Sequence, residues 1–404
     1  MNQAYIVDAV RSAFGKYTGS LSSIRTDDLA ALAIKALIER NPKLPIDKID
    51  DVILGCHNQA GEDNRNVARM AALLAGLPFS VPGETINRLC SSGMSAVVHA
   101  KRAIQSGDGD LFISGGIEHM TRGPWVISKS DRPFGKNVEM HDSSFGWRFV
   151  NPKMKALYGT DPMGNTAENL AELYKISRED QDLFAYNSQQ KAAKAKNSGR
   201  LAEEIFPIEL VQRKKPSIWF NEDEFIREDT TLEKLAALNT YFKKESDGGT
   251  VTAGNASGIN DGAAAMLIAS ETALKQYDLT PKARIVASQV VGVEPKYMGI
   301  GPVDASKKAL IKAGLTLKDI GIIEFNEAFS AQALACTRLL NIEDNDPRVN
   351  PNGGAIAIGH PLGASGTRIL QTAAIELHKR NERYALVAMC VGVGQGYATI
   401  IEKV

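Results

Sequence analysis

A cysteine occupies an unusual position in the stretch Thr85-Ile-Asn-Arg-Leu-Cys-Ser-Ser-Gly93. Cys90 ends a short apolar run, and small, helix-compatible residues follow it to about Ile104. At the start of a helix, unpaired N–H groups and the helix dipole favour a thiolate over a thiol. The same N–H groups can bind a carbonyl oxygen as it becomes negative. A lone free cysteine more often serves packing, so Cys90 is a candidate nucleophile that needs partners.

Two further residues provide such partners. Cys390 ends the predicted strand 384–389 and is followed by Val-Gly-Val-Gly-Gln-Gly396, whose spacing differs from that of a dinucleotide-binding loop. His360 lies in the glycine-rich stretch 353–366, where an imidazole can take the proton of a thiol. Asn326 follows a predicted buried strand, and its amide can orient a water molecule or a substrate oxygen. These four residues predict one shared cleft.

The elements that carry these residues recur along the chain. A strand at 4–10, a helix at 27–39 and a strand at 52–54 match the later run 283–290, 304–313 and 320–325. The helix after Cys90 and the strand 110–116 likewise match the helix 365–380 and the strand 384–390. Strands that alternate with helices predict parallel sheets covered by helices. Two unrelated α/β segments are the alternative to a pseudo-two-fold pair of halves.

A polar, uneven segment separates the two halves. Residues 121–248 form too long a segment for a connector and are predicted to be an inserted module. Ser177 is a suitable N-cap for a helix at 178–198 within it. We therefore predict three parts: residues 1–120 together with 249–273, the insertion 121–248, and residues 274–404.

Composition excludes several classes of protein. The 404 residues hold 47 Lys plus Arg and 47 Asp plus Glu, so no net charge favours nucleic acid or an anionic membrane. We find no secretion signal and no apolar run near the roughly 20 residues of a membrane span. The four cysteines form no CxxC pair, so neither a disulfide framework nor a metal site is predicted. A cytoplasmic location is expected.

Taken together, the motifs resemble those of the thiolase family from about Tyr5 to the C-terminus. The residues that carry the resemblance lie in five motifs in the family's order: Asn87-Arg-Leu-Cys-Ser-Ser-Gly93, Thr252-Ala-Gly-Asn-Ala-Ser-Gly258, Asn326-Glu-Ala-Phe329, 353–366 and Cys390-Val-Gly-Val-Gly-Gln-Gly396. The resemblance implies the layered α/β/α/β/α thiolase fold, with a loop domain inserted in the first half. It also implies Claisen chemistry on coenzyme A thioesters, with coenzyme A as a co-substrate and no permanently bound cofactor.

The resemblance assigns a role to each reactive group. Cys90 would attack the 3-keto carbon, and His360 would keep its sulfur ionised. Cys390 would give a proton to the departing acetyl-CoA enolate. One oxyanion hole would use His360 and a water held by Asn326, and the other would use the backbone N–H groups of Cys90 and Gly392. Transfer through an acyl-cysteine implies ping-pong kinetics.

The resemblance also implies binding residues and an assembly. Ser257 and Ala253 belong to the pantetheine-binding loop, and Arg227 matches a position near the adenine. Met163, Met298 and Phe329 match positions that line the acyl pocket. Members of the family are usually dimers of dimers, so a homotetramer is expected, with part of the insertion making the tetramer contact.

This sequence departs from the pattern of the acetoacetyl-CoA thiolases in two ways that bear on the substrate. The family's acetoacetyl-CoA thiolases typically have a histidine where this chain has Pro162, while stretches 55–70 and 146–152 resemble the 3-oxoadipyl-CoA thiolases. That substrate carries a distal carboxylate, which needs a cation when it is buried. Arg65 and Arg148 are the candidates, and a surface or interface role is the alternative for each. An acetyl-CoA C-acetyltransferase or a broad 3-ketoacyl-CoA thiolase remains the alternative activity.

Overall fold

The computed structural model describes residues 2–404 and contains a central sheet of eleven strands in that range. Its main path runs β13-β14-β15-β12-β1-β11-β5-β3-β4. The strands of the first half are β1 (Ala4–Ser12), β3 (Asp51–Gly55), β4 (Gly83–Ile86), β5 (Leu111–His119) and β11 (Asn260–Ser270). Those of the second half are β12 (Ala283–Gly292), β13 (Ile320–Phe325), β14 (Tyr384–Val391) and β15 (Gln395–Lys403).

The two halves repeat one strand order. In the first half β3 is parallel to β5, which is antiparallel to β11, and β11 is antiparallel to β1. In the second half β13 is parallel to β14, which is antiparallel to β15, and β15 is antiparallel to β12. Antiparallel pairing of Tyr5 with Arg284 joins β1 to β12 and makes the sheet continuous. The predicted pseudo-two-fold repeat is confirmed in place of two unrelated segments.

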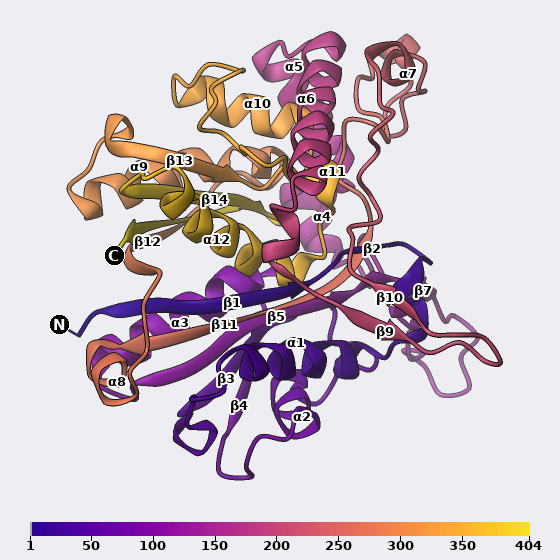
Figure 1. Ribbon diagram of the computed structural model, residues 1–404. Helices are drawn as coiled ribbons and strands as arrows, with labels where there is room; N and C mark the ends of the chain where they lie inside the picture. The colour runs from indigo at the N-terminus through magenta and orange to yellow at the C-terminus, as the bar shows by residue number, and fades with distance from the viewer. Residues whose placement is uncertain (1) are drawn as a thin grey trace.

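Helices cover the sheet in layers (Figure 1). Helix α3 (Ser92–Ser106) and helix α12 (Leu362–Lys379) pack against each other in the middle, where they share one apolar core with both halves of the sheet. Helix α1 (Thr26–Arg40) and helix α2 (Val67–Leu74) cover the outer face of the first half. Helix α9 (Gly301–Ala313) covers that of the second half. The predicted five layers are thus observed.

The apolar sequences of the strands explain this burial. Every residue of β5 and of β11 is buried, because helices cover both faces of these strands. The helices present alanine-rich faces to the sheet, which lets the layers approach closely. In the remaining part of the second half, α10 (Ser330–Leu339) follows β13 and the short α11 (Ala355–Ile358) precedes α12.

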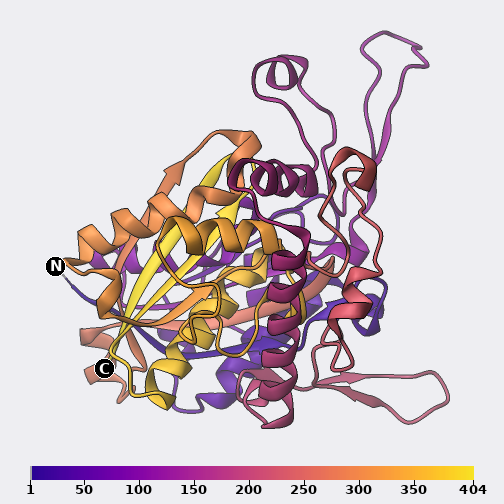
Figure 2. The same cartoon turned by 90° about the horizontal axis from the view of Figure 1, so that it is seen from above.

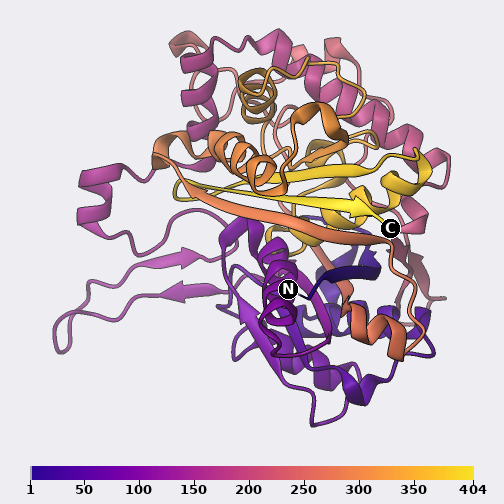
Figure 3. The same cartoon turned by 90° about the vertical axis from the view of Figure 1, so that its left-hand side faces the viewer.

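Part of the segment 121–248 packs against the layered core, and part of it projects away from the core (Figures 2 and 3). Its hairpin β6 (Trp125–Ile127) and β7 (Met140–Asp142) extends far from the body of the molecule (Figures 2 and 3). The predicted helix at 178–198 is observed as α6, Arg178–Asn197, and the Ser177 hydroxyl accepts a hydrogen bond from the Asp180 N–H at 3.0 Å. The segment also contains α4 (Pro152–Tyr158), α5 (Met163–Tyr174), α7 (Leu232–Ala236) and the hairpin β9 (Ile208–Leu210) with β10 (Ile218–Phe220).

The short elements complete the chain. Strand β2 (Gly15–Lys16) pairs with β11, β8 (Ile205–Phe206) pairs with β1, and α8 (Glu271–Gln276) follows β11. Within residues 2–404, no helix is both long enough and apolar enough to cross a membrane.

Candidate active site

Cys90 lies at a sharp turn between strand β4 and helix α3. It sits in a short 3₁₀ turn, Leu89–Ser91, directly before α3. Leu89 adopts a left-handed φ of 46°, and its N–H donates to the Asn87 side chain at 2.9 Å. The Ser92 hydroxyl donates to the Leu89 carbonyl at 2.7 Å. These local bonds hold the turn that presents Cys90, whose side chain is partly exposed.

The environment of Cys90 favours the neutral thiol in the free protein. Burial raises the pKa of Cys90 to about 11, although the backbone N–H groups of Gly392 and of Cys90 itself lie against the sulfur and lower it. We expected the start of the helix to favour the thiolate, but here loss of hydration outweighs the nearby donors. The same two N–H groups are those predicted to form an oxyanion hole, and the structure brings them together at the sulfur.

His360 stands immediately before helix α12, as Cys90 stands before α3. Its Nδ1 lies 2.6 Å from the Ser365 hydroxyl, and that hydroxyl donates to the Pro361 carbonyl at 2.9 Å. A serine hydroxyl has one hydrogen, so Ser365 must accept from the Nδ1–H group of His360. The lone pair of the imidazole therefore lies on Nε2. Ser365 is a residue that the sequence reasoning missed.

Asn326 faces the free nitrogen of this imidazole. Its amide nitrogen lies 3.3 Å from His360 Nε2, which fits the tautomer fixed by Ser365. Its amide oxygen has no hydrogen-bond partner although it is buried, so it is free to accept one from a water or a ligand. Burial, together with the nearby Arg368, lowers the pKa of His360 to about 3. The imidazole is therefore neutral and able to accept a proton.

Cys390 reaches the same place from the second half of the chain. It is the penultimate residue of β14 and is 1% exposed. Burial raises the pKa of Cys390 well above its usual range, and the nearby Cys90 adds to this effect. A thiol with a raised pKa holds its proton until a stronger base forms beside it. Cys390 thus lies near Cys90, and Asn326, the neighbour of His360, donates its N–H to the carbonyl of Ala388, two residues before Cys390 on β14, at 3.0 Å.

Close packing of the two central helices aligns the site. A Cβ atom added at Gly93 in α3 would lie 2.4 Å from the Gly363 carbonyl in α12, so only glycine allows this approach. The buried carboxyl group of Glu118, in β5, accepts hydrogen bonds from the N–H groups of Gly363 at 3.0 Å and of His57 at 3.0 Å. Burial raises the pKa of Glu118 to about 8. Glu118 therefore ties the start of α12 to the loop after β3.

Glu118 also belongs to a group of potential metal ligands with Cys56 and Asp63. Hydrogen bonds already occupy this group. Glu118 accepts a third one from the Asn58 N–H at 3.1 Å, and Asp63 accepts from the Gly61 N–H at 2.8 Å and from the Cys56 thiol at 3.7 Å. These bonds tie the three side chains to the loop after β3.

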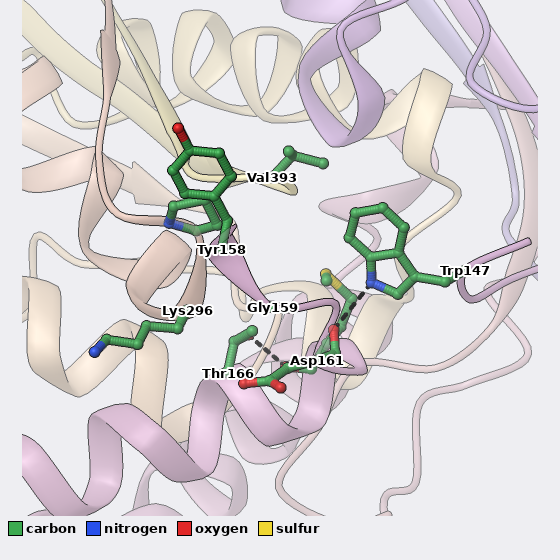
Figure 4. A pocket seen from close by; sticks show the side chains of 9 residues that line it. Trp147, Tyr158, Gly159, Asp161, Thr166, Lys296 and Val393 are labelled. Carbon is green, nitrogen blue, oxygen red and sulfur yellow. Dashed lines mark hydrogen bonds between the residues drawn. The ribbon is translucent and has the colours of Figure 1, made fainter. Parts of the chain in front are cut away.

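The predicted acyl-pocket residues share one apolar cluster with Cys390. Met298 and Phe329 are buried in it, and the half-buried Met163 packs against it. Met163 also lines a pocket that opens beside the site (Figure 4). This pocket is lined by Trp147, Tyr158, Gly159, Asp161, Met163, Thr166, Pro295, Lys296 and Val393.

The loop that holds Ala253 and Ser257, two of the predicted coenzyme A residues, contributes Val251 and Ala256 to this cluster. The N–H group of Ser257 donates to the Ala328 carbonyl at 2.9 Å, which docks its loop on the Asn326 to Phe329 motif. Ala253 in the same loop is exposed. Arg227 is exposed, and its guanidinium lies 5.5 Å from the centre of the Phe225 ring. Their roles in binding stay predictions.

The two candidate carboxylate-binding arginines differ in their surroundings. Arg148 is half-buried and donates to the Ser143 carbonyl at 3.2 Å and to the Asn58 side chain at 3.1 Å. Arg65 is exposed and has a left-handed φ of 54°. Neither lines the pocket beside Met163, where Lys296 is the cation among the lining residues.

Comparison with known proteins agrees with this geometry. Two family models match the chain: the thiolase N-terminal domain over residues 4–272 and the thiolase C-terminal domain over residues 279–403. The chain therefore belongs to the thiolase family, as the motifs predicted.

Individual relatives are similar over their full length. The 3-oxoadipyl-CoA/3-oxo-5,6-dehydrosuberyl-CoA thiolase of Escherichia coli is 57% identical over 404 residues, which is 100% of each chain. A beta-ketoadipyl-CoA thiolase of Acinetobacter baylyi has the same identity and coverage. The solved structure of human mitochondrial 3-ketoacyl-CoA thiolase has a TM-score of 0.91 and 41% identity, covering 100% of this chain and 99% of that one. The predicted thiolase fold is confirmed.

Proposed function

We propose that this chain cleaves 3-oxoadipyl-CoA with coenzyme A, giving succinyl-CoA and acetyl-CoA. Two observed pairs support the chemistry: Cys90 beside Cys390, and His360 beside Asn326, whose N–H binds the Ala388 carbonyl on the strand that carries Cys390. The choice of substrate is supported by full-length relatives at 57% identity whose names specify 3-oxoadipyl-CoA or beta-ketoadipyl-CoA.

The first half-reaction breaks the carbon–carbon bond. Cys90 gives its proton to Nε2 of His360, and its sulfur bonds to the 3-keto carbon. The oxygen of that carbon becomes negative, and one of the two predicted oxyanion holes stabilises it. The bond between C2 and C3 then breaks, and its electron pair stays on C2 of the acetyl-CoA enolate. Cys390 protonates C2, so acetyl-CoA leaves and a succinyl group remains on Cys90.

The second half-reaction transfers this acyl group to coenzyme A. The Cys390 thiolate removes the proton of the incoming coenzyme A thiol, whose sulfur attacks the thioester carbon on Cys90. Succinyl-CoA forms, and the leaving sulfur of Cys90 recovers its proton from His360. Each residue thus ends in the protonation state in which it began. The raised pKa of Cys390 matches its role as an acid that must be neutral at the start.

The binding residues and the assembly are part of the same proposal. Coenzyme A lies along the loop with Ala253 and Ser257 and extends toward Arg227. The parts 1–120 with 249–273 and 274–404 hold the reactive groups, and the part 121–248 covers them. The projecting hairpin exposes large apolar side chains, including Trp125 at 70% and Met140 at 58%, which a homotetramer would bury.

The test compares substrates on the purified protein. We expect cleavage of 3-oxoadipyl-CoA in the presence of coenzyme A at a kcat/KM at least tenfold above that for acetoacetyl-CoA. Product analysis should show succinyl-CoA and acetyl-CoA in equal amounts. A preference for straight-chain 3-ketoacyl-CoAs would instead support a broad 3-ketoacyl-CoA thiolase, the activity named for a relative from Pseudoalteromonas translucida that is 45% identical. No cleavage of any 3-ketoacyl-CoA would reject the proposal.

A further inference from the structure

Val393 has a backbone conformation that valine rarely adopts. It lies in the tight turn between β14 and β15 with a φ of 61°, and Gly394 follows with a φ of 78°. Turns with two successive left-handed residues favour asparagine and glycine. A β-branched side chain in this region is a true outlier and costs on the order of 1–3 kcal/mol.

The surroundings fix this strained turn. The Val293 N–H donates to the Gly394 carbonyl at 2.8 Å, and a Cβ added at Gly394 would lie 2.2 Å from the Val293 carbonyl. A Cβ added at Gly396 would likewise lie 2.0 Å from the backbone of Gly301. The turn therefore cannot relax to suit valine. Such strain persists because the surrounding structure fixes the backbone, and it is frequent at active sites and ligand clamps.

Core packing does not account for the valine side chain. It remains 40% exposed and lines the pocket of Figure 4, across from Trp147 and Tyr158. The residue before it is Gly392, whose N–H lies against the Cys90 sulfur. Met163 lies in the same pocket and in the apolar cluster that contains Cys390. The Val393 side chain thus stands where the pocket meets the reactive groups.

We infer that Val393 determines the acyl specificity of this enzyme by forming the wall of a subsite for the acyl chain beyond the keto carbon. The inference rests on the proposed thiolase chemistry and adds the position of the substrate's acyl chain in the site. Chains with several carbons beyond the keto group contact Val393, Trp147 and Tyr158, whereas a single methyl group ends before reaching them. Lys296 also lines this pocket, but its ammonium group is paired with the Glu294 carboxylate at 3.1 Å, so the inference concerns the apolar wall of the subsite.

The test replaces Val393 with glycine, which adopts this φ without strain. We expect the ratio of kcat/KM for 3-oxoadipyl-CoA to that for acetoacetyl-CoA to fall about tenfold, because contacts with the distal carbons are lost. The same fall is expected for the ratio of 3-oxohexanoyl-CoA to acetoacetyl-CoA. The Tm should stay equal to that of the wild type or rise by about 1–2 °C. Val393→Asn should also leave the Tm unchanged, since asparagine tolerates this conformation.

Val211→Gly is the matched control, because Val211 is 84% exposed and lies outside the pocket; it should leave both ratios unchanged. Ratios within twofold of the wild type in Val393→Gly would overturn the inference, and so would a loss of several degrees in its Tm. The 3-oxohexanoyl-CoA arm separates this inference from the choice of substrate. If the wild-type protein fails to cleave 3-oxoadipyl-CoA, the substrate proposal fails. The ratio of kcat/KM for 3-oxohexanoyl-CoA to that for acetoacetyl-CoA still decides the role of Val393.

Discussion

Replacing Ser365 with alanine tests how the imidazole of His360 is oriented. In the structure Ser365 accepts from Nδ1–H at 2.6 Å and donates to the Pro361 carbonyl at 2.9 Å. Without the hydroxyl, the buried Nδ1–H group has no acceptor, which costs about 1–3 kcal/mol. The other tautomer escapes this cost but places a proton on Nε2, facing the Asn326 amide nitrogen at 3.3 Å. Either outcome weakens the base that accepts the Cys90 proton.

We expect kcat/KM for thiolysis of acetoacetyl-CoA to fall about 10- to 100-fold in Ser365→Ala, since about 1.4 kcal/mol corresponds to a factor of ten. Loss of the enolate absorbance of acetoacetyl-CoA measures the rate. Ser365→Thr keeps a hydroxyl and should recover most of the activity, which a purely structural role of the small side chain would not allow. Ser306→Ala removes another buried hydroxyl, on α9, and serves as the control. A rate within threefold of the wild type in Ser365→Ala would refute this reasoning.

Three further predictions follow from the site. Cys90→Ser should abolish acylation, whereas Cys390→Ser should spare acylation of Cys90 by acetyl-CoA better than carbon–carbon bond chemistry; equal loss of both steps, followed by labelled acetyl-CoA, would contradict the division of roles. Arg148→Met should raise KM for 3-oxoadipyl-CoA far more than for acetoacetyl-CoA if this arginine binds the distal carboxylate, and Arg65→Met is tested alongside; equal effects on both substrates would exclude each. The pKa of His360 is about 3 in the folded protein and 6.5 in the unfolded chain. Between pH 6.5 and pH 3 the unfolded chain therefore binds a proton that the folded protein does not bind. Stability present above pH 6.5 is therefore lost as the pH falls, by about 2 kcal/mol at pH 5 relative to pH 8; unfolding curves of His360→Gln should lack this part of the pH dependence, and identical curves would refute it.

The sequence predicts the layered architecture because its signals are local. Apolar runs of strand length alternate with helical patterns twice, and these patterns place β1, β3, β12 and β13 close to their observed bounds. The Ser177 cap is likewise a local pattern. Continuity of the sheet through Tyr5 and Arg284 was not predicted, because it depends on how two distant strand ends meet.

The site was predictable in its residues but not in its protonation states. The small residues after Cys90 and the glycine-rich loops beside His360 and Cys390 indicate reactive groups without showing how deeply these groups are buried. Burial dominates the pKa of all three, and burial arises from segments far apart in the sequence. The role of Ser365 was also missed, because the helix predicted to start there begins at Leu362, which places Ser365 in the first turn below the imidazole.

A single carboxyl group connects two parts of the chain that are far apart in sequence. Glu118 binds backbone N–H groups 60, 61 and 245 residues away, so one side chain serves both repeats at once. Chimeras that exchange one repeat between related enzymes must therefore keep this contact on both sides of the junction. An exchange that shifts β5 would also move the start of α12, the helix that follows His360, while each repeat remained correctly folded by itself.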